Sequence, residues 1–245
     1  MKTIKFSSQY NTEEFGNNIP RPKPALNHIP EAYKKLERFI GGHPKTESKT
    51  VKTCVPFLDA MKHGYMIPFS SDISCYYDEE NKTMNFDVHP NMIKNEHQFG
   101  VNTHLDIQVP EDLRYNRRTV DKVFKFGNTW HIKTPPGYSC FFTQPNNNNQ
   151  PFQIIDGIVD TDTYPLIVAF PFYWTRDYAK PYMIKQGDPM VQVIPFKRED
   201  WKATYGYYDD QEALKATAFT FGAWFENAYR KLHWKKKTFK CSYLV

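Results

Sequence analysis

The sequence predicts a mainly β protein of the α+β class, built as a single β-sandwich or barrel domain with a short N-terminal helix and a C-terminal helix. Aromatic residues make up 16% of the 245 residues, and aromatic side chains are enriched in strands. The 18 prolines outnumber the 11 glycines, which favours fixed loops over long helices. Short apolar segments follow one another closely, as in sandwiches and barrels.

The first 30 residues are predicted to form an extended arm that wraps its own domain or a neighbouring one. The segment is polar, and proline fixes φ and removes a hydrogen-bond donor; its prolines are Pro20, Pro22, Pro24 and Pro30. Residues 31–245 are then one β-rich domain. It begins with an amphipathic helix over 31–40, which places four apolar side chains on one face and stops at Gly41-Gly42. Those four are Tyr33, Leu36, Phe39 and Ile40.

Short apolar segments broken by proline, glycine and turn residues predict the strands, and 104–109 also alternates between apolar and polar residues. Residues 89–103 read as a loop. The expected strands are 65–69, 72–77, 83–88, 104–109, 120–126, 129–134 and 138–143, followed by apolar strand segments within 152–160, 165–174 and 190–196. Gly127-Asn128 is a candidate hairpin turn, and Pro145 with four asparagines predicts a loop. The last element is a helix over 210–232, with apolar residues at helical spacing.

Charge and cysteine spacing exclude several classes of protein. A net charge of +5 is mild for a nucleic-acid binder, which gathers its basic residues on one face. The dense run Lys235–Lys237 is therefore read as a solvated tail, with a nucleic-acid contact as the alternative. The four cysteines lack the close pairs of a zinc site and indicate reduced, mostly buried thiols. Without a signal peptide or an apolar membrane span, we expect a protein of the host-cell cytoplasm, or of a virion.

Three short motifs occur in a recognisable order. They are Pro135-Pro136-Gly137-Tyr138, Gly157-Ile158-Val159-Asp160, and Gly187-Asp188 followed by Gln192. This order resembles that of the dUTPase and dCTP deaminase superfamily, a trimeric β-rich fold. Together with residues 52–65 and 192–201, the same block also resembles an uncharacterised family of phage and bacterial proteins. That second resemblance extends over more of the chain and implies no activity.

The superfamily resemblance implies a nucleotide hydrolase in which Asp160 orients or activates a water molecule. Asp162 would be a second nearby carboxylate, Mg²⁺ would be required, and the binding residues would be Tyr138, Gly157, Gly187, Asp188 and Gln192. The sequence departs from the pattern after Tyr138, where TQPNNNN replaces the Arg-x-Ser-Gly phosphate loop. A glycine-rich closing arm and the Ser-Arg pair and Glu of a deaminase are not recognisable either. The alternative is that both aspartates are turn or cap residues between strands.

A second possible chemistry is the facial triad of a non-haem iron oxygenase. His104-x-Asp106 would supply two Fe²⁺ ligands, His131 or His233 the third, and Arg176 or Arg198 would hold a co-substrate carboxylate. The alternative is a half-exposed strand with a polar face.

The aromatic clusters point instead to assembly. Residues 170–174 are expected in the core. Tyr205, Tyr207 and Tyr208 precede two aspartates, which favours a protein interface over base stacking. We therefore expect a non-enzymatic structural or interaction protein, phage-encoded and without a cofactor. It would act as a virion or accessory component whose partners are other protein subunits, as a homo-oligomer or a larger assembly. The nucleotide hydrolase and the iron oxygenase are the two alternatives.

Overall fold

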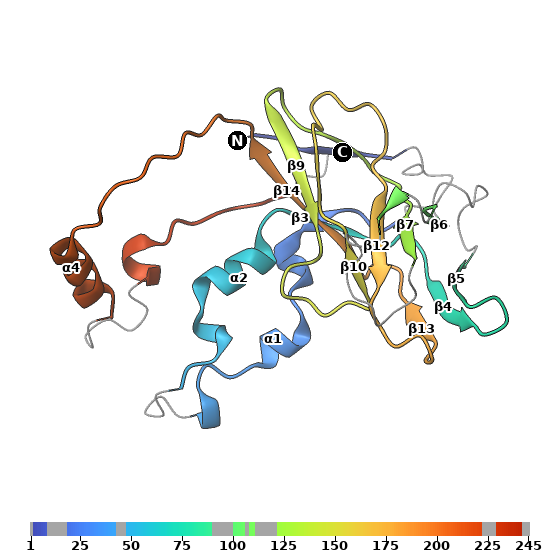
Figure 1. Cartoon of the computed structure of the whole chain (residues 1–245), viewed down its shortest axis with the longest axis horizontal. Helices are drawn as coiled ribbons and strands as arrows, with labels where there is room; N and C mark the ends of the chain where they lie inside the picture. Colours follow the sequence, from blue (N-terminus) through green and yellow to red (C-terminus); the bar gives the residue numbers. More distant parts are fainter. Residues whose placement is uncertain are drawn as a thin grey trace.

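The computed structural model describes residues 2–8, 19–42, 48–89, 100–105, 108–110, 122–221 and 229–241. In these ranges the fold is mainly β with several antiparallel sheets, which confirms the predicted fold class (Figure 1). The α-helices are α1 (Glu31–Lys35), α2 (Val55–Lys62) and α4 (Asp210–Phe221). Single helical turns are η2 (Ala25–His28), η3 (Ile40–Gly42), η4 (Val51–Thr53) and the π-type turn η7 (Tyr229–His233).

The sheet with the most strands in the described structure is five-stranded. Its order is β11 (Gly157–Val159), β9 (Tyr138–Thr143), β14 (Pro189–Lys197), β3 (Tyr65–Pro68) and β2 (Lys23–Pro24), all antiparallel. The central strand β14 buries Val191 and Val193 completely. Its register against β9 ends on the pair Lys197 and Tyr138. The residue after β14 therefore lies beside the first residues of β9.

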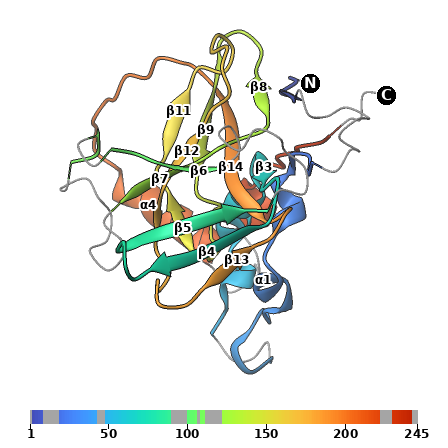
Figure 2. The same cartoon turned by 90° about the vertical axis from the view of Figure 1, so that its right-hand side faces the viewer.

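Three further groups of strands complete the fold (Figure 2). A four-stranded sheet has the order β10 (Phe152–Ile154), β12 (Phe170–Trp174), β7 (Val123–Phe126) and β6 (Val101–Thr103). A three-stranded sheet has the order β13 (Tyr182–Ile184), β4 (Ile73–Asp78) and β5 (Thr83–Val88). The N-terminal strand β1 (Lys5–Ser7) pairs with β8 (His131–Lys133), so this part of the predicted N-terminal arm lies on its own chain.

The core is built from aromatic rings, as expected for 170–174. Phe170, Phe172 and Trp174 are buried, and Phe126 stacks on Phe172 with ring centroids 3.7 Å apart. Phe69 meets Phe126 edge to face. Offset and edge-to-face contacts add to the energy of apolar burial, so part of the high aromatic content goes into the core.

The helix predicted over 31–40 is wrong beyond Lys35. The next residues pair with a later segment instead, since the amide of Ile40 donates to Ser48 O and that of Thr50 to Arg38 O. Ile40 is consequently exposed. Helix α2 was not predicted, because Pro56 reads as a breaker although proline is well tolerated in the first turn of a helix.

Several strand predictions also need correction. The loop expected at 89–103 contains β6. The described part of 104–109 forms a turn, closed by the Gln108 amide on Leu105 O, and the strand expected from 165 starts only at Phe170. Gly127-Asn128 is not a hairpin turn, because β7 and β8 belong to different sheets. Asn128 is buried. Its Nδ2 donates to Trp130 O, and its Oδ1 accepts from the Trp130 amide.

The C-terminal part leaves the sheets and then returns. After β14 the chain runs outward as an extended stretch to α4, and a second extended stretch leads back to the body (Figure 1). We call residues 199–221 the arm and residues 234–241 the tail. Of the helix predicted over 210–232, α4 covers the first 12 residues and η7 overlaps the end, while 222–228 lie outside the described residues.

Candidate functional site

The strand register gathers part of the predicted site at one end of the five-stranded sheet. Because Lys197 pairs with Tyr138 on β9, Arg198 follows directly, and its amide donates to Gly137 O at 2.9 Å. On the other side of β9, Val159 pairs with Cys140, so the turn after β11 comes to the same end. We call Ser139, Asp160, Asp162 and Arg198 the carboxylate cluster.

Arg198 is the centre of this cluster. Its Nη1 donates to Asp162 Oδ1 at 2.9 Å and its Nη2 donates to Asp162 Oδ2. The same Nη1 reaches Ser139 Oγ at 3.0 Å, and it lies 3.3 Å from Asp160 Oδ1. Paired contacts between a guanidinium and a carboxylate fix geometry as well as charge. The guanidinium thus ties the end of β14 to the turn that follows β11.

The two carboxylates differ in their surroundings. Hydrogen bonds from Arg198 hold the pKa of Asp162 at about 2, although desolvation opposes this shift. Gly137, whose φ of +80° suits glycine, adds its amide to Asp162 Oδ2 at 2.8 Å. The side chain of Asp160 is 60% exposed, and Ser139 Oγ donates to it at 2.6 Å. Asp162 therefore links the turn after β11 to Gly137 and Arg198, whereas the carboxylate of Asp160 faces solvent.

The cluster offers little to a metal ion. Mg²⁺ prefers several oxygen ligands, usually carboxylates together with substrate phosphates. Of the two carboxylates, only that of Asp160 faces outward, and it already accepts a hydrogen bond from Ser139 and has a guanidinium 3.3 Å away. Across the described ranges no group of three or more His, Cys, Asp and Glu residues is arranged to hold an ion. The donor set does not fit the Mg²⁺ that the superfamily resemblance implies.

The remaining residues predicted to bind ligand lie elsewhere. Gly157 is on the edge strand β11. Gly187 adopts φ +90° in the turn before β14, and Asp188 accepts the Lys185 amide within that turn at 2.9 Å. The structure thus brings Tyr138 and both aspartates together, but not the third motif.

Gln192 is fully buried and serves as an internal cross-link. Its Nε2 donates to Ala60 O at 2.8 Å and to His63 O at 2.7 Å, while its Oε1 accepts the Asn146 amide at 2.8 Å. The three bonds join β14 to two other segments of the chain. The side chain fixes the end of α2 and the asparagine-rich loop on β14.

Of the proposed iron ligands, those that the structure describes belong to no group of three or more His, Cys, Asp and Glu residues that could hold an ion. His104 lies in the turn described above, with its Nδ1 2.9 Å from Gln108 Oε1. His131 is half-buried on β8, and His233 ends η7. Asp106 lies outside the described residues, so the iron site stays a prediction. Arg176 stacks on the ring of Tyr182 at 4.5 Å.

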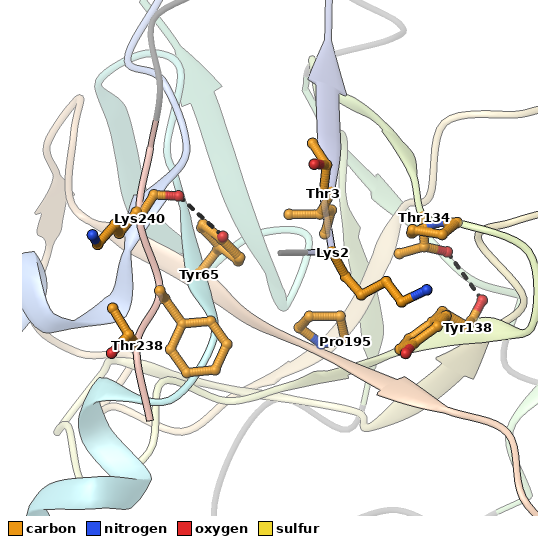
Figure 3. Close-up of a pocket in the computed structure, with 11 residues that line it drawn as sticks. Lys2, Thr3, Tyr65, Thr134, Tyr138, Pro195, Thr238 and Lys240 are labelled. Carbon is orange, nitrogen blue, oxygen red and sulfur yellow. Dashed lines mark hydrogen bonds between the residues drawn. The ribbon is translucent and has the colours of Figure 1, made fainter. Parts of the chain in front are cut away.

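A cavity of about 240 Å³ lies next to the carboxylate cluster (Figure 3). The rings of Tyr65, Tyr138 and Phe239 and the prolines at 135 and 195 form much of its wall. Lys2 and Lys240 also line it, one from each end of the chain. Thr134 Oγ1 donates to Tyr138 O at 3.0 Å, and Tyr65 Oη to Lys240 O at 3.1 Å. No single motif marks this cavity, because its walls are far apart in sequence.

The tail is anchored on helix α2 by Asp59. Trp234 Nε1 donates to Asp59 Oδ2 at 2.7 Å and Lys237 Nζ at 2.8 Å, while Lys62 lies 2.7 Å from Oδ1. Burial raises the pKa of Asp59, but these hydrogen bonds outweigh it and lower the pKa to about 2. One lysine of the basic run is therefore an ion-pair partner within the protein. Lys235 and Lys236 are exposed.

The arm carries the most exposed aromatic side chains in the described structure. The exposed fractions are 89% for Trp201, 98% for Tyr205, 108% for Tyr207 and 69% for Tyr208. The three tyrosines are the predicted interface residues. Trp201 was not singled out, although an aromatic residue next to Glu199-Asp200 is the same signal.

No protein-family model matches the sequence, and no curated protein matches it significantly. None of the helices that the structure describes is long and apolar enough to cross a bilayer.

Proposed function

We propose that this chain is a non-enzymatic assembly protein that associates with further copies of itself through its C-terminal arm, as a phage-encoded virion or accessory component. The observation that carries the proposal is the row of almost fully exposed aromatic side chains on the arm. Large apolar side chains gathered on an exposed surface mark interaction sites. Tryptophan and tyrosine are also the residues that most often dominate the energy of an interface.

The size of the aromatic row suits a protein partner. An aromatic side chain buries about 150–250 Å², so four of them bring roughly 600–1,000 Å². A standard interface buries about 800 Å² on each partner. The arm could therefore supply most of one side of a stable contact.

The arm is also held at both ends. Arg198 fixes its start against Tyr138 and Asp162, and Asp59 anchors the tail that follows it. Two attachments keep the intervening segment with its own body while it projects outward (Figure 1). A segment attached at both ends loses less conformational entropy on binding than a free one does.

The charge of the arm favours a copy of the chain over a nucleic acid. Residues 199–221 contain five carboxylates and two lysines, a net charge of −3. Since the whole chain carries +5, the remainder carries +8. An acidic arm is repelled by phosphates and attracted to a basic body.

The test compares the mass in solution of the wild type with a variant in which Trp201, Tyr205, Tyr207 and Tyr208 are all serine. We expect a wild-type assembly larger than 28.9 kDa and a monomeric variant. The control replaces the exposed Leu105 and Leu166 of the body with serine and should assemble normally. A monomeric wild type, or assembly by the four-serine variant, would contradict the proposal.

A nucleotide hydrolase is the second candidate, because Asp160 and Asp162 lie together in the carboxylate cluster and Tyr138 lies beside them, bonded through its carbonyl to Arg198. Against it, Arg198 occupies Asp162, and the Asn146 amide in the expected phosphate loop is already used by Gln192. Pyrophosphate release from a panel of deoxynucleoside triphosphates tests it. Turnover that disappears in Asp160→Asn would establish the hydrolase.

A further inference from the structure

The cavity beside Tyr138 has the size and walls of an anchor site for one side chain. Small-molecule sites usually measure about 300–1,000 Å³, and this cavity measures about 240 Å³. Three aromatic rings and two prolines form much of its wall, which favours a flat apolar group. Interface hot spots are typically aromatic side chains seated in such pockets.

Two lysines give the cavity a positive rim. Lys2 extends along one side of it in Figure 3, with its Nζ 5.7 Å from the centre of the Tyr138 ring. Lys240 lies on the opposite side (Figure 3). Both are exposed. The apolar wall favours an aromatic ring, and the two lysines favour a negative charge next to that ring.

The arm has that chemistry. Its aromatic run ends with Tyr207-Tyr208 and is followed at once by Asp209-Asp210. We propose that the cavity receives a tyrosine of this run from a second copy of the chain, with the following aspartates facing Lys2 and Lys240. This inference rests on the proposed function and names the surface that the arm binds.

A second copy is the occupant because the arm leads away from its own cavity. Arg198 is held beside Tyr138, and from there the chain runs outward to α4 (Figure 1). The tyrosines are thereby presented to a neighbour. If two copies exchange arms in this way, each contributes the same arm and the same cavity, which is the self-complementary contact of a two-fold dimer.

The first experiment alters the cavity in the full-length chain and measures the dissociation constant of self-association. Thr238→Trp fills the cavity from its rim and should weaken association at least about tenfold, since it removes the anchor contact. Lys240→Glu should weaken it several-fold, and adding Asp209→Lys should restore part of the loss. Lys180→Glu is the control, an exposed lysine elsewhere on the body, and should have no effect.

The second experiment identifies the contact directly. A photoreactive benzoylphenylalanine at position 207 is mixed with isotopically heavy wild-type chain, and the cross-linked peptides are sequenced. Cross-links from position 207 to heavy peptides containing Tyr138 or Pro195 support the inference. Cross-links to other surfaces, or only within one chain, overturn it.

The two proposals fail in different ways. If the wild type assembles while Thr238→Trp and Lys240→Glu leave the dissociation constant unchanged, the cavity assignment is wrong and the assembly function stands. Failure of Asp209→Lys to restore any association to Lys240→Glu also overturns the assignment. If the wild type is monomeric, both proposals fail.

Discussion

Arg198, the first residue after β14, grips both carboxylate oxygens of Asp162, three residues beyond the end of β11. The contact joins the two strands that flank β9 on opposite sides and closes that end of the sheet. It also sets the point from which the arm departs. Asp162, which the superfamily resemblance implies as a second carboxylate of the site, is thus held in an ion pair between two strands.

Replacing Arg198 with alanine should lower thermal stability and change its dependence on pH. The pKa of Asp162 is about 2 in the folded protein and about 3.9 in an unfolded chain. The ionised carboxylate therefore stabilises the fold above about pH 4, and this contribution is lost as the pH falls toward 2. Melting curves between pH 2 and pH 6 should show a shallower loss for Arg198→Ala than for the wild type. Equal slopes would mean that the pair contributes nothing.

Gln192→Ala should lower the free energy of unfolding by about 3 kcal/mol, because it leaves buried backbone groups without partners. The affected groups are Ala60 O, His63 O and the Asn146 amide. Gln153→Ala, whose half-buried side chain makes one long bond to Ile154 O, is the matched control and should cost less. Urea titration measures both. A Gln192→Ala protein as stable as this control would refute the cross-linking role.

Gly64→Ala should be among the most damaging small substitutions. A Cβ there would lie 2.1 Å from Val193 O, and the φ of +77° disfavours any side chain. We expect a loss of about 3 kcal/mol or more, since both overlap and backbone strain contribute. Gly187→Ala has a φ of +90° but open space around it, so it should cost about 1 kcal/mol. Chemical unfolding of the two variants should rank them in that order.

Asp59→Asn should release the tail at neutral pH. The pKa of Asp59 is about 2, so in the wild type its ionised form holds Trp234 and Lys237 above about pH 4 and lets them go as the pH falls toward 2. Hydrogen exchange of residues 234–241 should be faster in the variant at pH 7. Asp78→Asn, which alters a carboxylate confined to its own turn, should leave the tail protected.

Two of the four thiols should resist labelling in the folded protein. Burial raises the pKa of Cys75 to about 12 and that of Cys140 to about 11. Cys54 and Cys241 are exposed, which corrects the expectation of mostly buried thiols. A disulfide reagent should therefore modify two cysteines quickly and the others only after unfolding. Rapid modification of all four would contradict the packing around β4 and β9.

The local pattern of the sequence predicts where many strands lie. It does not predict which strands pair with each other. The segment 83–88 alternates and matches β5, and 138–143 matches β9. Strands that follow each other in sequence do not always pair. Strands β7 and β8 belong to different sheets, and between them the side chain of Asn128 hydrogen-bonds to the backbone of Trp130. The helix over 31–40 ends early for a similar reason, because tertiary hydrogen bonds override a helical pattern.

The same distinction applies to the candidate site. Asp160 ends a sequence motif and Asp162 follows it closely, but Arg198 is 36 residues beyond Asp162, and its position depends on the register of β14. The cavity combines the first and last parts of the described chain, which no local pattern can relate. The interface role predicted for Tyr205, Tyr207 and Tyr208 comes from composition alone, and the structure places all three side chains on the surface.

Assembly through the arm is best tested by the native mass of the wild-type protein, measured by sedimentation equilibrium over a range of concentrations. We expect a reversible assembly with a mass that is a multiple of 28.9 kDa, and we expect the four-serine arm variant to lose it. A single species of 28.9 kDa at every concentration would contradict it.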